Sequence, residues 1–174
     1  MIVLGIDPGS RVTGFGVVRR EGSKLSALGE GRILVPTAAE PPARLSALAT
    51  EVEQLLERYR PDAVVLESLF HGANSRSLIV LAQARGAILT AVGRAGLDAI
   101  EYSPAEVKRA VTGNGRADKS QVARMVRLLL GLDAAARSAD ATDALAAAIC
   151  FAQRQRLDAL ERPRDRAANG RVRR

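Results

Sequence analysis

The chain has 174 residues, of which 47% are hydrophobic and 26% charged, and its formal net charge is +7. This size and composition are typical of one globular domain with a substantial core, and no apolar run approaches the roughly 18 residues that a bilayer span requires. A single cysteine, Cys150, excludes an intramolecular disulfide framework and is typical of a reducing compartment. Because the N-terminus carries no basic region and cleavage site, we expect a cytoplasmic protein.

The positive charge is concentrated at the C-terminus. From Arg154 onward, eight arginines stand against three acids, so this segment carries +5 and the rest of the chain +2. The low apolar content predicts a basic, disordered tail over 154–174, after a folded domain over 1–153. Such a tail either binds the phosphates of nucleic acid or only keeps the protein in solution.

The first third of the chain predicts a three-stranded meander followed by a helix. Buried-strand patterns run over Ile2–Asp7, about Thr13–Arg19 and about Leu25–Leu34, and links rich in glycine and serine join them, as hairpins require. After Pro41, apolar residues recur with a 3.6-residue period up to Tyr59, which predicts a helix.

Strands and helices then alternate. The run AVVLE, which ends at Glu67, predicts a short buried strand, and a helix over about Ser75–Arg94 and a brief strand in LDAIEY follow it. We expect three more helices: Pro104–Val111, one after the glycine-rich loop TGNGRADK, and a last one from near Ser138 through Phe151. This alternation indicates an α/β fold with a mixed sheet.

Two of the predicted strands end in an acid, Asp7 and Glu67. A strand, a helix and a second strand usually pair in parallel, so both carboxylates should meet at the carboxyl edge of the sheet, where ligands bind in open α/β folds. Adjacent carboxylates repel each other, and a divalent cation resolves that repulsion. The structural alternative is that Asp7 only caps the turn at Pro8-Gly9.

A second pair of acids occurs in SADATDALAAAI, where Asp140 and Asp143 share one face near the start of the last helix. Acids in a first turn also complement the helix dipole, and Asp140 can serve as an N-cap, so this pair alone also has a structural interpretation. If all four carboxylates meet, their hard oxygen atoms suit Mg²⁺ or Mn²⁺, whereas histidine and cysteine are too scarce for a zinc site.

Four stretches are distributed along nearly the whole chain up to about Gln153: GIDPGSRVTGFGVV, VVLESLFHGANSRSLIVLAQARGA, SPAEVKRAVTGNGRADKSQV and DATDALAAAI. In content and order they resemble the signatures of the RuvC family of bacterial Holliday junction resolvases. The resemblance implies a ribonuclease-H-like fold, with a mixed five-stranded sheet flanked by helices, and Mg²⁺-dependent nicking of four-way DNA junctions. It also implies two metal ions per active site, for which Mn²⁺ can substitute, and products with 5′-phosphate and 3′-hydroxyl ends.

The resemblance assigns roles residue by residue. It implies metal binding by the four acids Asp7, Glu67, Asp140 and Asp143, and because some relatives carry histidine where this chain has Asp140, the site here is all-carboxylate. Two lysines, Lys108 and Lys119, match basic residues near the cleaved strand, and Phe70 matches an aromatic residue of the loop that enters the junction centre. Further candidate DNA contacts are His71, Arg76 and Arg116.

Each of these basic and aromatic residues also has an ordinary structural interpretation. Lys108 and Lys119 are two of only three lysines, yet a solvated lysine is common at any surface. Phe70 either stacks on an unpaired base or covers the end of the sheet. The loop TGNGRADK either offers backbone N–H groups and Arg116 to a phosphate or only forms a tight turn.

The resemblance also implies partners. A four-way junction has two strands to cut, and a twofold homodimer presents two identical sites to it. We expect the dimer interface on the helix containing SLIVLAQARGAILTAV, because its apolar residues cover more than one stripe. Association with the RuvA–RuvB branch-migration complex is the other implied contact.

Three alternatives remain open from the sequence. GIDPGSRVTGFGVV also resembles the phosphate loop of actin-like ATPases and sugar kinases, but these proteins need two such domains, which 174 residues cannot hold. A non-catalytic nucleic-acid-binding domain of the same fold would have lost one or more acids, and none is missing. A related nuclease that acts on another DNA structure would share the acids but not the need for Phe70.

Overall fold

The computed structural model of the protein describes residues 1–9, 11–35, 39–68, 75–133 and 138–161. Its first three strands form an antiparallel meander: β1 (Ile2–Asp7), β2 (Val12–Glu21) and β3 (Lys24–Leu34). Two further strands, β4 (Ala63–Glu67) and β5 (Ala99–Tyr102), pair in parallel on the other side of β1. The strand order is therefore β3-β2-β1-β4-β5, a mixed five-stranded sheet, as predicted.

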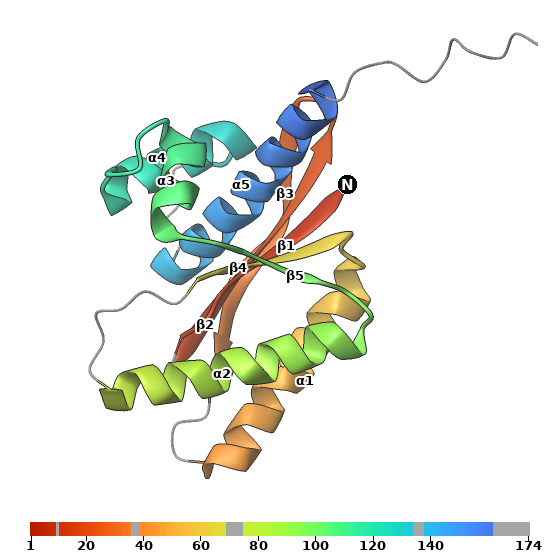
Figure 1. Cartoon of the computed structure of the whole chain (residues 1–174), viewed down its shortest axis with the longest axis vertical. Helices are drawn as coiled ribbons and strands as arrows, with labels where there is room; N and C mark the ends of the chain where they lie inside the picture. The colour runs from red at the N-terminus through yellow and green to blue at the C-terminus, as the bar shows by residue number, and fades with distance from the viewer. Residues whose placement is uncertain (10, 36–38, 69–74, 134–137, 162–174) are drawn as a thin grey trace, which may run out of the picture.

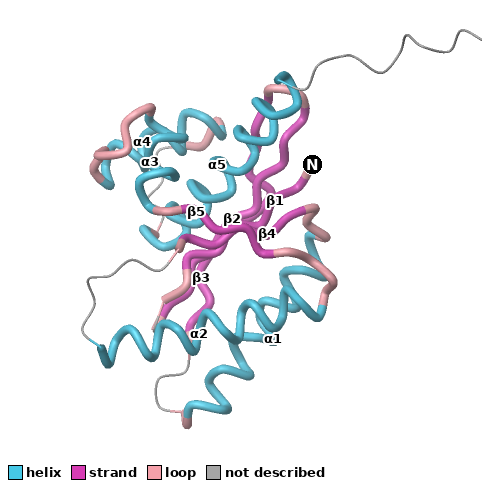
Figure 2. Tube along the Cα trace, viewed as in Figure 1, coloured by secondary structure: helices cyan, strands magenta, loops and turns pink. Residues whose placement is uncertain are grey.

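In the part of the chain that the structure describes, five helices cover the two faces of this sheet (Figures 1 and 2). They are α1 (Pro41–Tyr59), α2 (Ser75–Arg94), α3 (Pro104–Thr112), α4 (Lys119–Leu130) and α5 (Ala139–Glu161). Helices α1 and α2 pack together on one face, and α5 lies on the opposite face with α3 and α4 beside it. None of the described helices combines the length and the apolar content that a membrane span requires.

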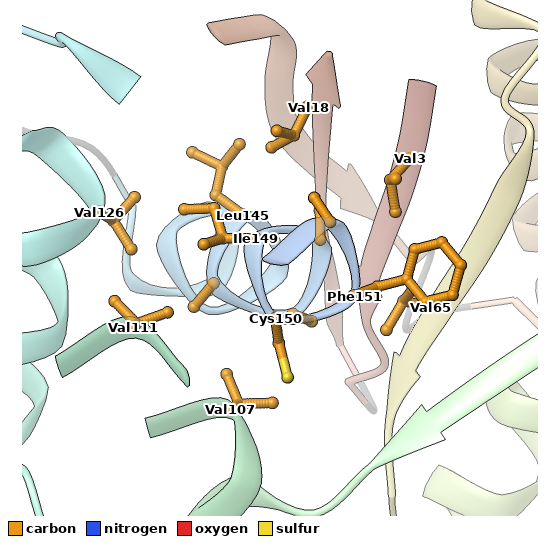
Figure 3. Packing of buried hydrophobic residues seen from close by; sticks show 14 of the residues in the cluster. Val3, Val18, Val65, Val107, Val111, Val126, Leu145, Ile149, Cys150 and Phe151 are labelled. Atoms are coloured by element: carbon orange, nitrogen blue, oxygen red, sulfur yellow. The ribbon is translucent and has the colours of Figure 1, made fainter. Parts of the chain in front are cut away.

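The core on the α5 face is built from small and β-branched side chains. Strand residues Val3, Val18 and Val65 contribute to one buried cluster with Leu145 and Ile149 of α5. Figure 3 shows α5 in the middle of this cluster, between the strand valines and the valines of α3 and α4. Alanines fill most other buried positions of α5, which lets the helix lie close to the sheet.

Glycines in the strands make this close approach possible. A Cβ atom on Gly5 would collide with the backbone carbonyl of Ala144, and a Cβ atom on Gly14 would collide with that of Asp140. The backbone of α5 therefore occupies the space that side chains of β1 and β2 would otherwise fill. This contact sets the distance between the sheet and the first turn of α5.

The core on the α1 and α2 face uses larger side chains. Leu4, Ile6 and Leu66 of the strands are completely buried against residues such as Leu48 and Ile88 of the helices. A hydrophobic layer of this kind supplies most of the free energy of folding but leaves ordinary van der Waals spacing between helix and sheet.

Local sequence signals fix where α3 and α4 begin and end. Ser103 and Glu106 form a capping box at the start of α3, and Asp118 and Gln121 form another at the start of α4. Helix α3 ends at Gly113, whose backbone is left-handed with φ of 79°. These caps define the loop between the two helices and hence the positions of the lysines that flank it.

Helix α5 differs from the expectation at its C-terminal end. The sequence predicted a helix that ends near Phe151, whereas α5 continues to Glu161. The predicted boundary of the basic tail at Arg154 therefore falls inside this helix. Gln, Arg, Leu and Ala in this segment are good helix formers, and reading the segment by its charge alone missed that propensity.

Candidate metal and junction-binding site

The register of the parallel strands brings Asp7 and Glu67 to the same edge of the sheet. Ile6 of β1 pairs with Leu66 of β4, so the next residue on each strand, Asp7 and Glu67, lies at the carboxyl end of the pair. This juxtaposition is the one that the two acid-tipped strands predicted. Both side chains are partly buried.

The first turns of α5 add Asp140 and Asp143 to this edge. Gly14 pairs with Asp7 across β1 and β2, and the backbone of Asp140 lies directly against Gly14. The capping role that Asp140 could have taken belongs to Ser138, whose hydroxyl accepts a 3.2 Å hydrogen bond from the Ala141 N–H. Asp140 is therefore not needed as an N-cap.

The charges of neighbouring acids act on the two strand-borne carboxylates, Asp7 and Glu67. Burial, followed by the charges of Asp143, Glu67 and Asp140, raises the pKa of Asp7 to about 7. Burial and the charge of Asp143 also raise the pKa of Glu67, while Lys119 and Lys108 oppose this rise. Such a concentration of negative charge in a partly buried place is unfavourable without a cation.

The donor set fits a hard divalent cation in charge and in chemistry, since all four candidates are carboxylates. Among the residues that the structure describes, no three histidine, cysteine or acidic side chains converge closely enough to form a ready-made metal-binding group. One carboxylate has a cationic neighbour instead, because the Lys119 ammonium lies 3.2 Å from Oδ2 of Asp143. Binding of a cation by all four acids therefore requires their side chains to move inward.

Lys108 and Lys119 flank this group of acids. Both line a cleft of about 230 Å³ together with Glu67, Asp143 and Ala146. The Lys119 side chain is 80% exposed, and Asp143 raises the pKa of its ammonium. The two predicted lysines and two of the predicted acids thus share one cleft.

The loop between α3 and α4 uses its own backbone N–H groups. The N–H groups of Asn114 and Arg116 donate to the Thr112 hydroxyl at 3.1 Å and to the Asn114 side-chain oxygen at 3.0 Å. Those of Ala117 and Asp118 also donate within the loop and the following cap. The tight-turn alternative therefore fits this loop better than an open phosphate cradle, although Arg116 itself is exposed.

Three of the predicted DNA contacts cannot be placed as side chains. Phe70 and His71 fall outside the described residues, in the segment between β4 and α2. Arg76 belongs to the first turn of α2, and only its backbone is described.

A polar network that the sequence interpretation missed holds α3 in place. The Glu106 carboxylate accepts from the Ser103 N–H and hydroxyl, both at 2.9 Å, and these bonds lower its pKa. Arg154 of α5 donates to the same carboxylate at 3.1 Å and lies over the ring of Tyr102. The Ser-x-x-Glu capping-box pattern in SPAE was the available signal.

A larger cavity lies elsewhere, between the C-terminal halves of α1 and α2. Its volume is about 480 Å³, and its walls include Leu56, Ala91 and the ion pair of Arg94 with Glu53. Volume alone would favour this cavity. The smaller cleft is the better candidate because it brings like charges together, and perturbed carboxylates concentrate at functional sites.

Comparison with known proteins identifies the family. The model of the family described as crossover junction endodeoxyribonuclease RuvC matches residues 3–151. The chain belongs to the RuvC family. Curated RuvC proteins agree: that of Rubrobacter xylanophilus is 48% identical over 158 residues, covering 91% of this chain and 88% of the relative. RuvC of Anaeromyxobacter sp. strain K is 50% identical over 155 residues, covering 89% of this chain and 82% of the relative.

Solved RuvC structures share the fold. The Thermus thermophilus RuvC structure is 36% identical, with a TM-score of 0.84, and the match covers 91% of this chain and 97% of that one. T. thermophilus RuvC in complex with Holliday junction substrate gives a TM-score of 0.86 at the same identity, covering 91% and 96%. The yeast mitochondrial resolvase Ydc2, at 14% identity and a TM-score of 0.67, shares the fold alone.

Membership of the RuvC family confirms the fold class and the function that the sequence motifs predicted. The protein is a crossover junction endodeoxyribonuclease, a hydrolase that resolves Holliday junctions. This excludes the ATPase and sugar-kinase alternative and the non-catalytic one.

Proposed function

We propose that Asp7, Glu67, Asp140 and Asp143 hold two divalent cations per active site, Mg²⁺ with Mn²⁺ as a substitute, and so cut junction DNA in paired, symmetric nicks. The observation that carries this proposal is the parallel register that sets Asp7 beside Glu67, with the first turn of α5 lying against Gly14. The rise in the pKa of Asp7 that burial and the charges of the other three acids cause supports it further.

The bound cations would supply an activated water and charge neutralisation at the scissile phosphodiester. The protein's own part is to hold four carboxylates on rigid elements, two on strands and two on one helix. Hydrolysis without a covalent enzyme intermediate leaves 5′-phosphate and 3′-hydroxyl ends, which a ligase can seal. Catalysis then consists of positioning and charge stabilisation.

The two lysines contact the DNA strand that is cut. Lys119 is exposed beside Asp143, and Lys108 lies in the same cleft, so each can reach a phosphate bound over the acids. Arg116 and Arg76 extend this positive surface, and Phe70 and His71 contact the unstacked centre of the junction.

A homodimer presents two such sites to one junction. Helix α2 carries the expected interface, and Ile79 and Leu89 on it are 59% and 37% exposed in the single chain. A second copy packed on this helix would cover these side chains, and a twofold axis would orient the two sites oppositely. The substrate's own near-symmetry favours this arrangement.

The remaining contacts follow from the same role. A resolvase acts after branch migration, so association with the RuvA–RuvB complex belongs to this proposal. The basic residues at the end of the chain add a non-specific attraction to DNA. The single buried, free thiol of Cys150 suits the cytoplasm of a bacterium.

The test uses a synthetic four-way junction and a linear duplex of the same sequence. Wild-type protein and Asp7→Asn are incubated with each DNA in Mg²⁺ and in EDTA, with Glu57→Gln, an exposed acid of α1, as the matched control. We expect paired nicks in the junction only, and loss of cutting in EDTA and in Asp7→Asn while junction binding persists.

Two results would contradict the proposal. Cutting by Asp7→Asn at the wild-type rate would remove this carboxylate from the metal site. Cutting that continues unchanged in EDTA would remove the metal itself. A Glu57→Gln variant that loses activity would show that the assay responds to any lost acid.

A further inference from the structure

Arg85 is a buried charged residue on α2, the helix that lies on the opposite face of the sheet from α5. Only 7% of the residue is exposed. Its Nη1 donates a 2.9 Å hydrogen bond to the backbone carbonyl of Glu67, and its Nη2 forms an ion pair with Glu101 of β5. One side chain thus ties α2 to two adjacent strands at the edge that carries the site.

Strand β1 offers no N–H group to the Glu67 carbonyl that Arg85 binds. The N–H of Ser68 donates to Tyr102 of β5, so the alternation of the strand directs the carbonyl of Glu67 toward β1. The pairing of β1 with β4 stops at Ile6 and Leu66, and the residue that would next donate from β1 is Pro8, which has no N–H. Arg85 supplies the hydrogen bond that the ladder cannot.

The side chain of Glu67 points to the other face. Val65 belongs to the cluster under α5, and Leu66 belongs to the cluster under α1 and α2, so Glu67 returns to the α5 side. Arg85 therefore acts on the backbone of Glu67 and does not touch its carboxylate. A well-packed apolar residue would anchor α2 without the cost of burying a charge, so the guanidinium is not explained by packing alone.

We propose that Arg85 is a positioning residue, which fixes the end of β4 so that the Glu67 carboxylate stays in place to bind metal. The inference rests on the proposed role of Glu67 as a metal ligand. It also links the site to α2, the helix on which we expect the dimer to form. Groups that hydrogen-bond directly to a metal-ligating side chain commonly change metal affinity by about 10- to 100-fold when they are lost, and Arg85 acts one step further out, through the backbone of the ligand residue.

The test compares four variants of the full chain: Arg85→Gln, Arg85→Lys, Glu101→Gln and the control Arg94→Gln. Arg94 is the last residue of the same helix and pairs with Glu53, but its side chain is 70% exposed. The main readout is the Mg²⁺ concentration that gives half of the metal-induced rise in melting temperature, measured without DNA. Junction binding in EDTA and single-turnover cleavage across a Mg²⁺ series are measured in parallel.

We expect the Mg²⁺ midpoint of Arg85→Gln to rise about 10-fold or more, with cleavage recovered at high Mg²⁺. Junction binding in EDTA should stay within about twofold of wild type, because Arg85 is buried and little of it can reach DNA. Lysine can donate to the carbonyl but cannot bridge both strands, so Arg85→Lys should fall between wild type and Arg85→Gln. Glu101→Gln should show a smaller rise, and Arg94→Gln none.

A lower melting temperature with an unchanged Mg²⁺ midpoint in Arg85→Gln would overturn the inference and leave Arg85 a structural residue. If Arg85→Gln does not fold, unchanged midpoints in both Arg85→Lys and Glu101→Gln would overturn it equally. Glu67→Gln separates this outcome from a failure of the proposed function. A Glu67→Gln variant that keeps the wild-type Mg²⁺ response would remove Glu67 from the site, whatever Arg85 does.

Discussion

On one face of the sheet, α5 lies against β1 and β2 through alanines and glycines, whereas on the other face α1 and α2 pack through leucine, isoleucine and valine. Both layers bury a continuous core. Among the described glycines, Gly5 and Gly14 bring strand backbone directly against the backbone of α5, and α5 also carries two of the four acids. A close contact between backbones fixes a position more tightly than contacts between side chains, which can change rotamer. The α5 face therefore positions the acids, whereas the face covered by α1 and α2 mainly stabilises the fold.

A leucine-to-alanine substitution on each face should test this difference between the faces with the largest effect. Leu48 of α1 and Leu145 of α5 are both buried, and replacing either by alanine should lower the free energy of unfolding by about 2 to 5 kcal/mol. Only Leu145→Ala should also slow single-turnover cleavage, by about tenfold or more, because α5 carries Asp140 and Asp143. Urea unfolding and cleavage at a temperature where both variants are folded provide the measurement. Equal losses of rate in the two variants would show that precision is not confined to the α5 face.

The contact of Gly14 with the backbone of Asp140 offers a second test of how the α5 face positions the acids. Gly14→Ala adds one methyl group that must displace the Asp140 backbone, so we expect destabilisation of about 1 to 3 kcal/mol and a loss of cleavage larger than that of Leu48→Ala. Junction binding in EDTA should persist, because α5 moves without unfolding. Wild-type cleavage by Gly14→Ala would mean that the spacing between β2 and α5 does not matter for the acids.

Charge is a further difference between the two faces. Repulsion among the acids beside α5 lowers the stability of the metal-free protein. The pKa of Asp7 is about 7 in the folded state and 3.8 as the ordinary value, so the unfolded state releases its proton first as pH rises. The stabilisation from this group is complete below about pH 4 and is lost as pH rises through 7. In EDTA at pH 7.5, Asp7→Asn should be more stable than wild type by about 1 to 2 kcal/mol, less than the whole shift implies because solvent screens the partly exposed group.

That gain should shrink toward zero as pH falls to about 4, and saturating Mg²⁺ should abolish or reverse it. Urea titrations of both proteins across this pH range, with Glu57→Gln as the control, give the difference directly. A gain that does not depend on pH would argue against repulsion among the acids as its cause.

The sequence predicted the strand-borne acids better than any other part of the site. Asp7 and Glu67 each end a short apolar run, and the parallel pairing rule alone brings them together. The sequence alone could not decide whether Asp140 and Asp143 bind metal or only stabilise the start of the helix, because acids in a first turn are common. The contact of Asp140 with Gly14 and the cap at Ser138, which are tertiary and local features of the structure, favour the first interpretation. The meander of β1, β2 and β3 and the parallel pairing of β1 with β4 also followed from hairpin and crossover rules, whereas the place of β5 at the edge was not predicted.

Two features depended on contacts between distant residues and were missed. Arg154 was assigned to a tail because its neighbours are charged, yet it pairs with Glu106 on another helix. Arg85 is the one charged residue in SLIVLAQARGAILTAV, which was a visible signal, but nothing in the sequence tells which strand it meets. Polar contacts across the fold are set by the spacing of elements, and local pattern does not contain that spacing.

The smallest effect is expected for a glycine that lies outside the contact between α5 and the sheet. It tests whether glycine is required for stability and cleavage only at that contact. Gly93 in the last turn of α2 is exposed, and a Cβ atom added there would meet nothing within 4 Å. Gly93→Ala should therefore raise the free energy of unfolding by up to about 1 kcal/mol, because alanine favours the helix and restricts the unfolded chain. Cleavage and the Mg²⁺ midpoint should equal those of wild type. Thermal unfolding of Gly93→Ala and Gly14→Ala under one condition should move in opposite directions, and destabilisation of both would mean that α2 needs this glycine for a contact outside the single chain.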